Sequence, residues 1–421
     1  MVSEFTVKLE KEEKSVKINK ITGEACKKLR PLWEEVFYED SKQFTDYYFE
    51  HKAEKNIGYV IGAFPHDAMM FRTPYELKIG EMQREISYIV GVATRKECRH
   101  RGYMRELLLH SFQEMYREKN PFTFLMPANP AIYEPFDFKY IYERDVWELK
   151  NAEETIPWLE SLTNGSDGIK ADIKETKEDG ELRAAEYTEA EKILSYSSLS
   201  NLDGLCSVRS LYKQREFSIF ELLAEFANRY LREHYDIYVH RDASYYEMQL
   251  KESEAQNGDI YVLFEKGSIK AFFLYAKEEN EIFLQEVMED CEGVLGFLQK
   301  TEKKKPMIMA RIIHLEEMMK LVCSKENRTM VMEIEDELIP ENAGTYIWEM
   351  TASGSQVTKI RSQANKQSED KSIKSEQMAL KSDRKEKGET IENPDKIPKV
   401  SMHIREFAPW VLTGAFINEI V

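Results

Sequence analysis

Several basic residues surround one glycine in the stretch VGVATRKECRHRGYMRELLLHSF, residues 90–112. Arg99, Arg101 and Arg105 are the arginines nearest to Gly102. An apolar run precedes them and an amphipathic helical pattern follows, so they fall at the expected start of a helix. The first turn of a helix has unpaired N–H groups and a positive dipole end, which together bind anions. The stretch therefore predicts a site for phosphate or diphosphate groups.

Glycine and arginine would have separate parts in such a site. Gly102 would let the backbone approach a ligand closely, and arginine side chains add charge-assisted hydrogen bonds to phosphate oxygens. The spacing Arg99-x-x-Gly102 is not a Walker loop, because it lacks the GK[ST] ending, and it is not the dinucleotide pattern GxGxxG. From the residues alone, a solvated basic turn remains the alternative to a ligand loop.

The elements that must position this loop predict a mixed α/β domain. Apolar spacing indicates two helices within residues 22–52 and one helix at 102–118. Strands are predicted at 57–64, 84–94 and 122–126, with a further strand between the first two. This order of helices, antiparallel strands, helix and strand fits a domain of about 150 residues.

Two further units are expected beyond the first domain. The sequence predicts a helix at 216–234 and three strands within 259–288. We interpret this unit as a second copy of the same kind of fold without the ligand loop. An unrelated α+β domain is the alternative. A strand and a helix at 307–322 begin the third unit, and a strand pair follows at 329–350. Residues 362–396 are nearly all polar or charged and are expected to form a flexible insertion.

Composition narrows the class of protein. A chain of 421 residues with 42% hydrophobic residues can build two or three domains. Its net charge of −17 argues against nonspecific nucleic-acid binding and favours cationic ligands such as amines. The five cysteines are scattered without a CxxC, and the eight histidines lack metal-ligand spacing, so we expect reduced thiols in a cytoplasmic protein and no metal site. No apolar segment has the length of a signal peptide core or of a membrane span.

The basic loop resembles the pyrophosphate loop of GNAT acetyltransferases, R/Q-x-x-G-x-G/A, with Met104 in place of the usual small residue. The stretch FLMPANPAIYEPFDFKYIYERDVWEL, residues 124–149, resembles one branch of that superfamily, the enhanced-intracellular-survival (Eis) type N-acetyltransferases. The resemblance implies an α/β (α+β) chain with a GNAT domain at 1–150, a GNAT-like middle domain without the coenzyme loop at 151–306, and a sterol-carrier-protein-like domain at 307–421. The insertion at about 362–396 is not a feature of that family.

The resemblance also assigns residues that would bind acetyl-CoA as co-substrate. The strand whose backbone holds the pantetheine and thioester end is matched by Val92, Ala93 and Thr94. The pyrophosphate loop is matched by Arg99, His100, Arg101, Gly102, Tyr103, Met104 and Arg105. A further coenzyme contact after the next strand is matched by Ala128 and Asn129.

Two catalytic residues are implied by the same resemblance. Tyr133 matches the general acid, and the main-chain carboxylate of Val421 matches the base of the family. A phenol of pKa about 10 is protonated at neutral pH and can donate as a thiolate leaves. A terminal carboxylate of pKa about 3.5 is a weak base, so it could equally orient Tyr133 and attract a cationic substrate. For Tyr133 itself, plain core packing is the alternative.

The leading hypothesis is an acetyl-CoA-dependent N-acetyltransferase without a metal ion. By resemblance its acceptor is a small molecule with primary amines, polyamine-like or aminoglycoside-like, and the protein is a homo-oligomer such as a hexamer. Neither nucleic acid nor a membrane is expected as a partner. A protein-lysine acetyltransferase and a non-catalytic acyl-CoA- or lipid-binding module are the alternatives.

Overall fold

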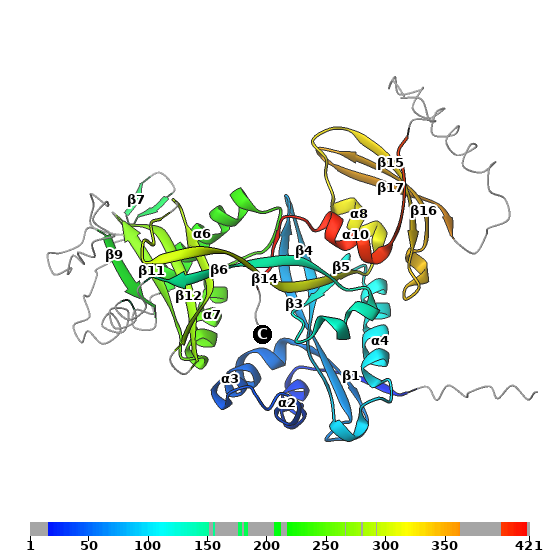
Figure 1. The fold of residues 1–421 in the computed structure, drawn as a ribbon, viewed down its shortest axis with the longest axis horizontal. Helices are drawn as coiled ribbons and strands as arrows, with labels where there is room; N and C mark the ends of the chain where they lie inside the picture. Colours follow the sequence, from blue (N-terminus) through cyan, green and yellow to red (C-terminus); the bar gives the residue numbers. More distant parts are fainter. Residues whose placement is uncertain are drawn as a thin grey trace, which may run out of the picture.

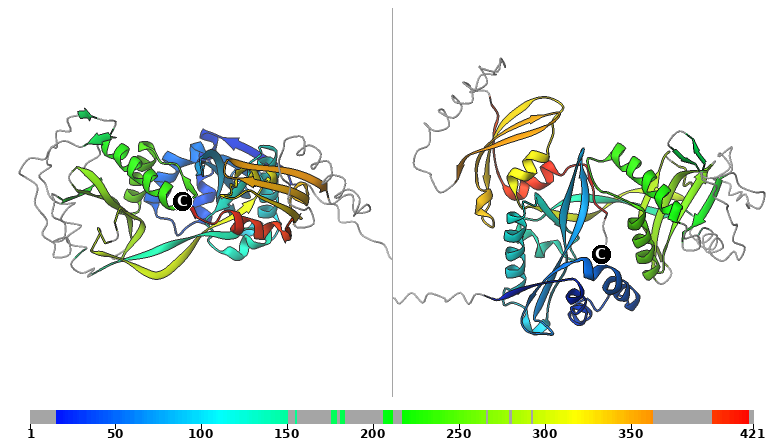
Figure 2. Two further views of the ribbon diagram at one scale, coloured as in Figure 1. Left: turned by 90° about the horizontal axis from the view of Figure 1, so that it is seen from above. Right: turned by 180° about the vertical axis from the view of Figure 1, so that it is seen from behind.

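The computed structural model describes residues 16–150, 155, 176–178, 181–183, 206–211, 217–265, 267–278, 281–291, 293–362 and 397–418. Two expectations fall outside these residues: nearly all of the insertion at 362–396, and Val421. Figure 1 shows a large central sheet, with a middle sheet on one side of it and a C-terminal sheet on the other. Figure 2 shows the same separation from behind, so the central sheet is the part that both other sheets adjoin.

The central sheet contains most of the residues expected to do chemistry. Its order is β1-β2-β3-β4-β5-β14-β6. Its strands are β1 (Ile18–Thr22), β2 (Ile57–Ile61), β3 (Ala68–Ile79), β4 (Met82–Thr94), β5 (Phe122–Leu125), β6 (Lys139–Leu149) and β14 (Leu298–Ile312). Neighbouring strands are antiparallel except β4 and β5, which run parallel. The strands predicted at 84–94 and 122–126 are confirmed, as is the further strand expected before them.

Strand β14 comes from far along the chain and yet lies between β5 and β6. Met309 of this strand is opposite Leu125 of β5 on one side and Tyr140 of β6 on the other. The strand expected at the start of 307–322 is therefore the end of β14, and it completes the central sheet. A local apolar pattern shows that a segment is a strand but not which sheet it joins.

Helices cover both faces of the central sheet. They are α1 (Glu24–Lys27), α2 (Arg30–Val36), α3 (Lys42–Tyr47) and α4 (Tyr103–Arg117). On one face, Arg72 of β3 donates to Glu118, just beyond the end of α4, at 2.5 Å. On the other face, the ring of Phe71 lies 6.4 Å from that of Trp33 in α2. Since side chains alternate along a strand, α4 and α2 lie on opposite sides of β3.

The segment 22–52 contains more breaks than the two expected helices. Pro31 lies in the first turn of α2, where proline is tolerated, and Phe37 leaves the helical conformation at φ −104° and ψ 53°. Ser41 caps α3 by accepting from the N–H of Phe44 at 3.1 Å. A π-helical turn at Tyr48–Lys52 and a 3-10 turn at Ala53–Lys55 follow. By contrast, the helix predicted at 102–118 is continuous as α4.

The middle sheet has the order β13-β12-β11-β9 and is covered by two helices. These elements are β9 (Cys206–Ser210), α6 (Phe217–His234), α7 (Ala243–Ala255), β11 (Asp259–Glu265), β12 (Ser268–Glu278) and β13 (Glu281–Glu289). The helix predicted at 216–234 and the three strands predicted within 259–288 are confirmed. A separate two-stranded sheet joins β7 (Thr176–Glu178) to β8 (Glu181–Arg183).

The C-terminal sheet has the order β17-β16-β15-β18. Its strands and helices are α8 (Leu315–Leu321), β15 (Arg328–Glu335), β16 (Gly344–Thr351), β17 (Gly354–Ser362), β18 (Lys399–His403) and α10 (Ile404–Val411). The predicted strand pair at 329–350 is confirmed, with Pro340–Asn342 forming the turn. Helix α10 then returns the chain to the central sheet, where it contacts β14 and β6.

The last described residues run back along the edge of the central sheet. Strand β10 (Ile237–Val239) pairs with β3, and β19 (Ala415–Phe416) pairs with β10. Phe416 and Ile417 are buried. The expected packing of the C-terminal segment is therefore confirmed as far as Asn418. None of the helices among the described residues is long and apolar enough to cross a membrane.

Candidate active site

Strands β4 and β5 separate part-way along their length. They are paired only at Ser87 with Thr123 and at Tyr88 with Phe124. On its other edge β4 remains paired with β3 as far as Thr94. The backbone edge of β4 between residues 90 and 94 thus has no partner in β5. This stretch includes Val92, Ala93 and Thr94, so the pairing between β4 and β5 ends before these three residues.

A bulge at Gly91 shapes this part of β4. Phe71 of β3 is opposite Val90, but Met69 is opposite Ala93, so β4 has one extra residue here. Gly91 has a φ of +62°, and a Cβ on it would lie 2.6 Å from the ring of Trp33. Both facts require glycine. A glycine inside the β-branched run IVGVAT was the sequence signal for this bulge, and the sequence analysis did not use it.

The basic loop ends in an uncapped helix. His100 has a φ of 63° and Gly102, the N-cap of α4, a φ of 82°. No side chain caps the helix, and its first backbone hydrogen bond runs from the N–H of Glu106 to the carbonyl of Gly102 at 3.0 Å. A Cβ on Gly102 would meet no atom within 4 Å, so the space beside it is open. The helix start can therefore accept an anion.

Three arginines of the loop are exposed and have no carboxylate partner among the described residues. Arg99 donates to the carbonyl of Thr94 at 3.3 Å, and Arg101 donates to the carbonyl of Glu97 at 2.9 Å. Arg105 lies over the ring of Phe136 at 5.9 Å. Their remaining N–H groups are free for phosphate oxygens. Arg95 differs, because it pairs with Glu35 at 3.3 Å and donates to the carbonyl of His66 at 2.8 Å.

The residues after β5 form a double turn that presents Tyr133. The turn consists of two 3-10 segments, Pro130–Ile132 and Glu134–Phe136, with Tyr133 between them. Asn129 begins it, because its side-chain oxygen accepts from the N–H of Ala131 at 3.1 Å. Ala128 and Asn129 are exposed. The turn is joined to α4 by the contact between Phe136 and the side chain of Arg105, so the basic loop and the turn are neighbours.

Tyr133 is half-buried and stays protonated. Its ring packs edge-on against Phe138 at 5.9 Å. Burial is the cause that raises the pKa of Tyr133 to about 12, and no hydrogen bond or charge from the described part of the chain contributes to that shift. At neutral pH the phenol is therefore a hydrogen-bond donor, and none of the described residues accepts a hydrogen bond from it.

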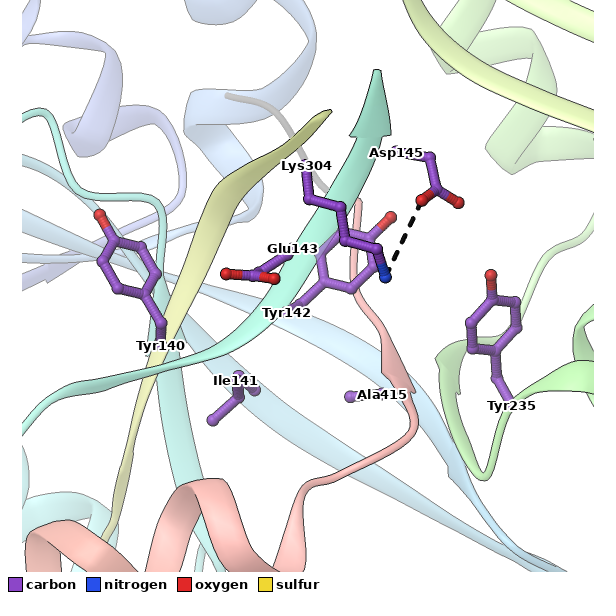
Figure 3. Close-up of a pocket in the computed structure, with 8 residues that line it drawn as sticks. All are labelled: Tyr140, Ile141, Tyr142, Glu143, Asp145, Tyr235, Lys304 and Ala415. Atoms are coloured by element: carbon purple, nitrogen blue, oxygen red, sulfur yellow. Dashed lines mark ion pairs between the residues drawn. The ribbon is translucent and has the colours of Figure 1, made fainter. Parts of the chain in front are cut away.

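A cavity of about 370 Å³ lies at the junction of the central sheet with the chain end. Its lining comprises Tyr140, Ile141, Tyr142, Glu143, Asp145, Tyr235, Lys304 and Ala415. Figure 3 shows Tyr142 in its centre, with Tyr140 and Tyr235 on either side. Lys304 turns toward Asp145 at 4.0 Å, and Lys300 pairs with the same carboxylate at 2.7 Å. Glu143 has no ion-pair partner among the described residues.

Tyr142, at the centre of the cavity, lies on the sheet face opposite α4. Phe124 of β5 is opposite Ala310 of β14, and Ile308, two residues earlier, is opposite Tyr142. Residues two apart on a strand share a face, so Tyr142 is on the same face as Phe124. The ring of Phe124 is 5.1 Å from that of Tyr88, where β4 and β5 begin to separate. Tyr142 of the cavity thus shares a sheet face with Tyr88, the last residue of β4 that pairs with β5.

Burial and nearby acidic groups raise the pKa of Tyr142 and of Tyr235, so both phenols are protonated at neutral pH. Neither hydroxyl group has a hydrogen-bond partner among the described residues. The sequence analysis missed this cavity, although the alternation in YIYE, residues 140–143, could have drawn attention to it. Tyr235 and Ala415 had no local signal, because they meet Tyr142 only in the folded chain.

The last described residues are anchored in a buried charge pair beside the cavity. Arg241 forms two hydrogen bonds with Glu286, one of them at 2.9 Å, and both residues are buried. The side-chain amide of Asn418 donates to the carbonyl of Gln285 at 2.8 Å. The ring of Phe416 lies 5.4 Å from that of Tyr142. The chain is therefore fixed against the cavity as far as Asn418, whereas Val421 lies outside the described residues.

These features suit transfer of a group from a phosphate-bearing carrier. An anion can bind at the uncapped helix start and its arginines, and an extended ligand can pair with the free edge of β4. A protonated phenol stands on the adjoining turn. No cluster of three or more histidine, cysteine, aspartate or glutamate side chains suited to a metal ion occurs in the portion of the chain that the structure describes.

Comparison with known proteins finds a family model that matches the first part of the chain. Residues 17–141 match the family model described as acetyltransferase (GNAT) domain. They include β4, the basic loop, α4 and the turn with Tyr133. This part of the chain is a GNAT domain, and the match supports an N-acetyltransferase. No match was found among curated proteins.

Solved structures share the fold over most of the chain at low identity. A conserved protein of unknown function from Enterococcus faecalis V583, described as a probable N-acyltransferase, is 14% identical with a TM-score of 0.64, over 95% of this chain and 90% of that chain. A GCN5-related N-acetyltransferase from Anabaena variabilis ATCC 29413 is 13% identical with a TM-score of 0.55, over 82% and 85%. Eis1 from Mycobacterium abscessus is 9% identical with a TM-score of 0.52, over 81% and 85%. These identities establish a shared fold only.

Proposed function

We propose that this protein transfers an acetyl group from acetyl-CoA to a primary amine, with Tyr133 as general acid. The observation that carries the proposal is the start of α4, which has no side-chain cap and whose arginines have no carboxylate partner among the described residues. It lies next to the turn of Tyr133 and follows the stretch of β4 that is not paired with β5. Acetyl transfer from a coenzyme thioester needs an anion site, a strand edge that can pair with an extended ligand, and a proton donor.

The coenzyme side of the proposed site uses the expected residues. The N–H groups at the start of α4 and the side chains around Gly102 would hold the diphosphate. The free edge of Val92–Thr94 would pair with the pantetheine and polarise the thioester carbonyl, and one such preorganised donor is worth about 3–4 kcal/mol. Ala128 and Asn129, at the start of the turn, would add a further contact. Acetyl-CoA would supply the activated acetyl group.

Tyr133 would act mainly as a hydrogen-bond donor to the departing sulfur. Its pKa of about 12 exceeds that of an ordinary thiol, about 8.5. Complete proton transfer from the phenol to the thiolate would therefore be unfavourable by about 5 kcal/mol, at 1.36 kcal/mol for each pKa unit. A donated hydrogen bond stabilises the developing negative charge without that cost, and the proton released by the amine can neutralise the thiolate later.

The acceptor amine is assigned to the cavity of Figure 3 in this proposal. Tyr142 of the cavity shares a sheet face with Tyr88, beyond which β4 and β5 are no longer paired. The lining offers three phenol groups and the carboxylate of Glu143, which has no ion-pair partner among the described residues. Aromatic faces and a carboxylate are suited to an ammonium group. The resemblance to Eis-type enzymes favours a polyamine-like or aminoglycoside-like acceptor, whose additional amines and hydroxyl groups the phenols would bind.

The main-chain carboxylate of Val421 is proposed as the base or as the group that orients Tyr133 and the amine. Support comes from Asn418, which is fixed beside the cavity three residues earlier. Three residues span at most about 10 Å. The finer architecture is part of the same proposal: a GNAT-like unit around the middle sheet, a sterol-carrier-protein-like unit around the C-terminal sheet, and a homo-oligomeric assembly.

A thiol-release assay tests the proposal. Purified protein with acetyl-CoA should release free thiol when polyamines or aminoglycosides are added, and Tyr133→Phe should lower kcat by about 10²- to 10³-fold, the loss of one hydrogen-bond donor, while acetyl-CoA still binds. Tyr38→Phe, at an exposed position that does not line the cavity, is the matched control for the loss of one phenol hydroxyl. Full activity of Tyr133→Phe would refute the role of this residue.

The same assay separates the alternatives. Acetyl-CoA binding without thiol release for any amine would favour a binding module. Acetylated lysines on partner proteins, detected by mass spectrometry while small amines stay unmodified, would favour a protein-lysine acetyltransferase. A variant extended beyond Val421 that keeps its full kcat would refute the part assigned to the Val421 carboxylate.

A further inference from the structure

The turn that presents Tyr133 ends in a residue with unusual backbone geometry. Asp137 has a φ of 64°, in the left-handed region that few residues other than glycine adopt. Its N–H donates to the carbonyl of Glu134 at 3.0 Å, and the N–H of Phe136 donates to the carbonyl of Tyr133 at 2.9 Å. Tyr133 is thus held by a turn whose last residue, Asp137, is almost completely buried.

The carboxylate of Asp137 belongs to a buried group of charges. Its Oδ2 lies 3.6 Å from a guanidinium nitrogen of Arg311, and the same nitrogen donates to Asp336 at 2.8 Å. The exposed fractions are 6% for Asp137, 0% for Arg311 and 4% for Asp336. His403 and Arg405 add nitrogens at 3.8 Å from the other oxygen of Asp137. We call Asp137, Arg311 and Asp336 the buried triad.

The buried triad connects three distant segments of the chain. Asp137 follows the turn of Tyr133, Arg311 is on β14 of the central sheet, and Asp336 directly follows β15 of the C-terminal sheet. Asp336 is itself fixed, since its Oδ1 accepts the N–H groups of Leu338 at 3.0 Å and Ile339 at 2.9 Å. The C-terminal sheet therefore holds one end of the triad rigidly, and the turn of Tyr133 is at the other end.

A second route of contacts leads from the triad to the same tyrosine. The guanidinium of Arg311 lies 5.0 Å from the ring centre of Phe112 in α4. Phe112 is 6.0 Å from Phe138, and Phe138 is 5.9 Å from Tyr133. The rings support the side chain of Tyr133, while the charges fix the end of its turn.

We propose that Asp137 and Arg311, held by Asp336, are positioning residues that fix the Tyr133 hydroxyl for acetyl transfer. This inference rests on the proposed role of Tyr133. Burying charges is costly, and such groups add less to stability than hydrophobic replacements do, but they define one geometry. A reacting group must be held to within about 0.5 Å. The C-terminal sheet would then be part of the catalytic unit, because it supplies the anchor.

Replacing Asp137 by asparagine isolates the positioning role. Asparagine tolerates the left-handed region and keeps a side-chain oxygen, while the charge is lost. Burial raises the pKa of the Asp137 carboxyl, although Arg311 and His403 oppose the shift, so a neutral side chain is not penalised there. Arg311 retains its bond to Asp336 in this variant. We therefore expect Asp137→Asn to fold.

Kinetics of Asp137→Asn give the first test. We expect kcat to fall by about 10- to 100-fold with the KM for acetyl-CoA unchanged, because a misplaced group costs rate rather than coenzyme binding. In a Tyr133→Phe background the same substitution should have no further effect. Asp290→Asn is the matched control: Asp290 pairs with Arg229 at 2.8 Å beside the middle sheet, and its loss should leave kcat unchanged.

The outcomes separate this inference from the proposed function. Equal losses of kcat in the wild-type and Tyr133→Phe backgrounds, or an unchanged kcat in Asp137→Asn, would overturn the inference alone. Full activity of Tyr133→Phe would instead refute the role of Tyr133. In that case the inferred link between Asp137 and the tyrosine is still testable without activity, by 3-fluorotyrosine at position 133. One narrow ¹⁹F resonance that becomes broad or split in Asp137→Asn supports the link, and an unchanged resonance overturns it.

Discussion

Gly91→Ala probes the bulge that separates β4 from β5. The residue has a φ of +62°, and its added Cβ would lie 2.6 Å and 3.0 Å from ring atoms of Trp33 and Phe71. The left-handed conformation costs an alanine roughly 1–2 kcal/mol. Overpacking a buried site costs about 1–3 kcal/mol more. We expect the free energy of unfolding to fall by about 2–5 kcal/mol.

Gly102→Ala is the matched control for this experiment. Its φ is +82°, but an added Cβ would meet no atom within 4 Å. This variant should lose only the conformational cost, roughly 1–2 kcal/mol. The difference between the two variants therefore isolates the crowding against Trp33, at about 1–3 kcal/mol.

Equilibrium urea unfolding measures both variants, with the fluorescence of the tryptophans as one probe and far-ultraviolet circular dichroism as another. The denaturant slope m has to match that of the wild type before midpoints are compared. Equal losses for Gly91→Ala and Gly102→Ala would refute the reasoning, because the bulge would then not be closely packed. A smaller loss for Gly91→Ala would contradict it more strongly.

Three further predictions follow from the site and its surroundings. The pKa of Tyr133 is about 12, so its phenol stays protonated below pH 12 and loses its proton only above that pH. The ratio of kcat between wild type and Tyr133→Phe should therefore stay constant from pH 7 to about pH 10. A change in this ratio with a midpoint between pH 7 and about pH 10 would contradict the assignment. Arg101→Glu should weaken acetyl-CoA binding in isothermal titration, and more so at low salt, whereas Arg117→Glu, at the far end of α4, should not. Arg241→Met should lower the free energy of unfolding by about 3–5 kcal/mol, because it removes the arginine that pairs with the buried carboxylate of Glu286. Adding Glu286→Leu should recover most of that loss, measured by urea unfolding. If the double variant recovers nothing, the pair itself stabilises the fold.

Much of the coenzyme side of the site could be predicted from the sequence. The β-branched run of β4, Gly102 and the amphipathic pattern of α4 are local signals, and they correctly indicated a strand, a turn and a helix start. These signals were sufficient because periodicity and glycine conformation depend on neighbouring residues. The broken helices of 22–52 were harder, since the apolar spacing indicates only two helices, whereas Pro31 and Ser41 begin separate short helices within that stretch.

The acceptor side could not be predicted in this way. Tyr142 and Tyr235 become neighbours only because β10 joins the edge of β3 while β6 joins β14. The buried triad has the same origin, since Asp137 and Asp336 meet through Arg311 of β14. No local sequence pattern predicts these contacts, because each contact depends on the strand register between segments that are distant in the sequence.

The sequence by itself determined that a basic loop with a glycine precedes a helix and that an aromatic turn follows the next strand, because such features depend on short-range backbone and side-chain preferences. Only the tertiary structure decided that β14 completes the first sheet, that β4 and β5 separate beyond Tyr88, and that the C-terminal sheet reaches the turn of Tyr133. These arrangements arise from long-range strand pairing and from the burial of charges, whose energies exist only once the whole chain is packed.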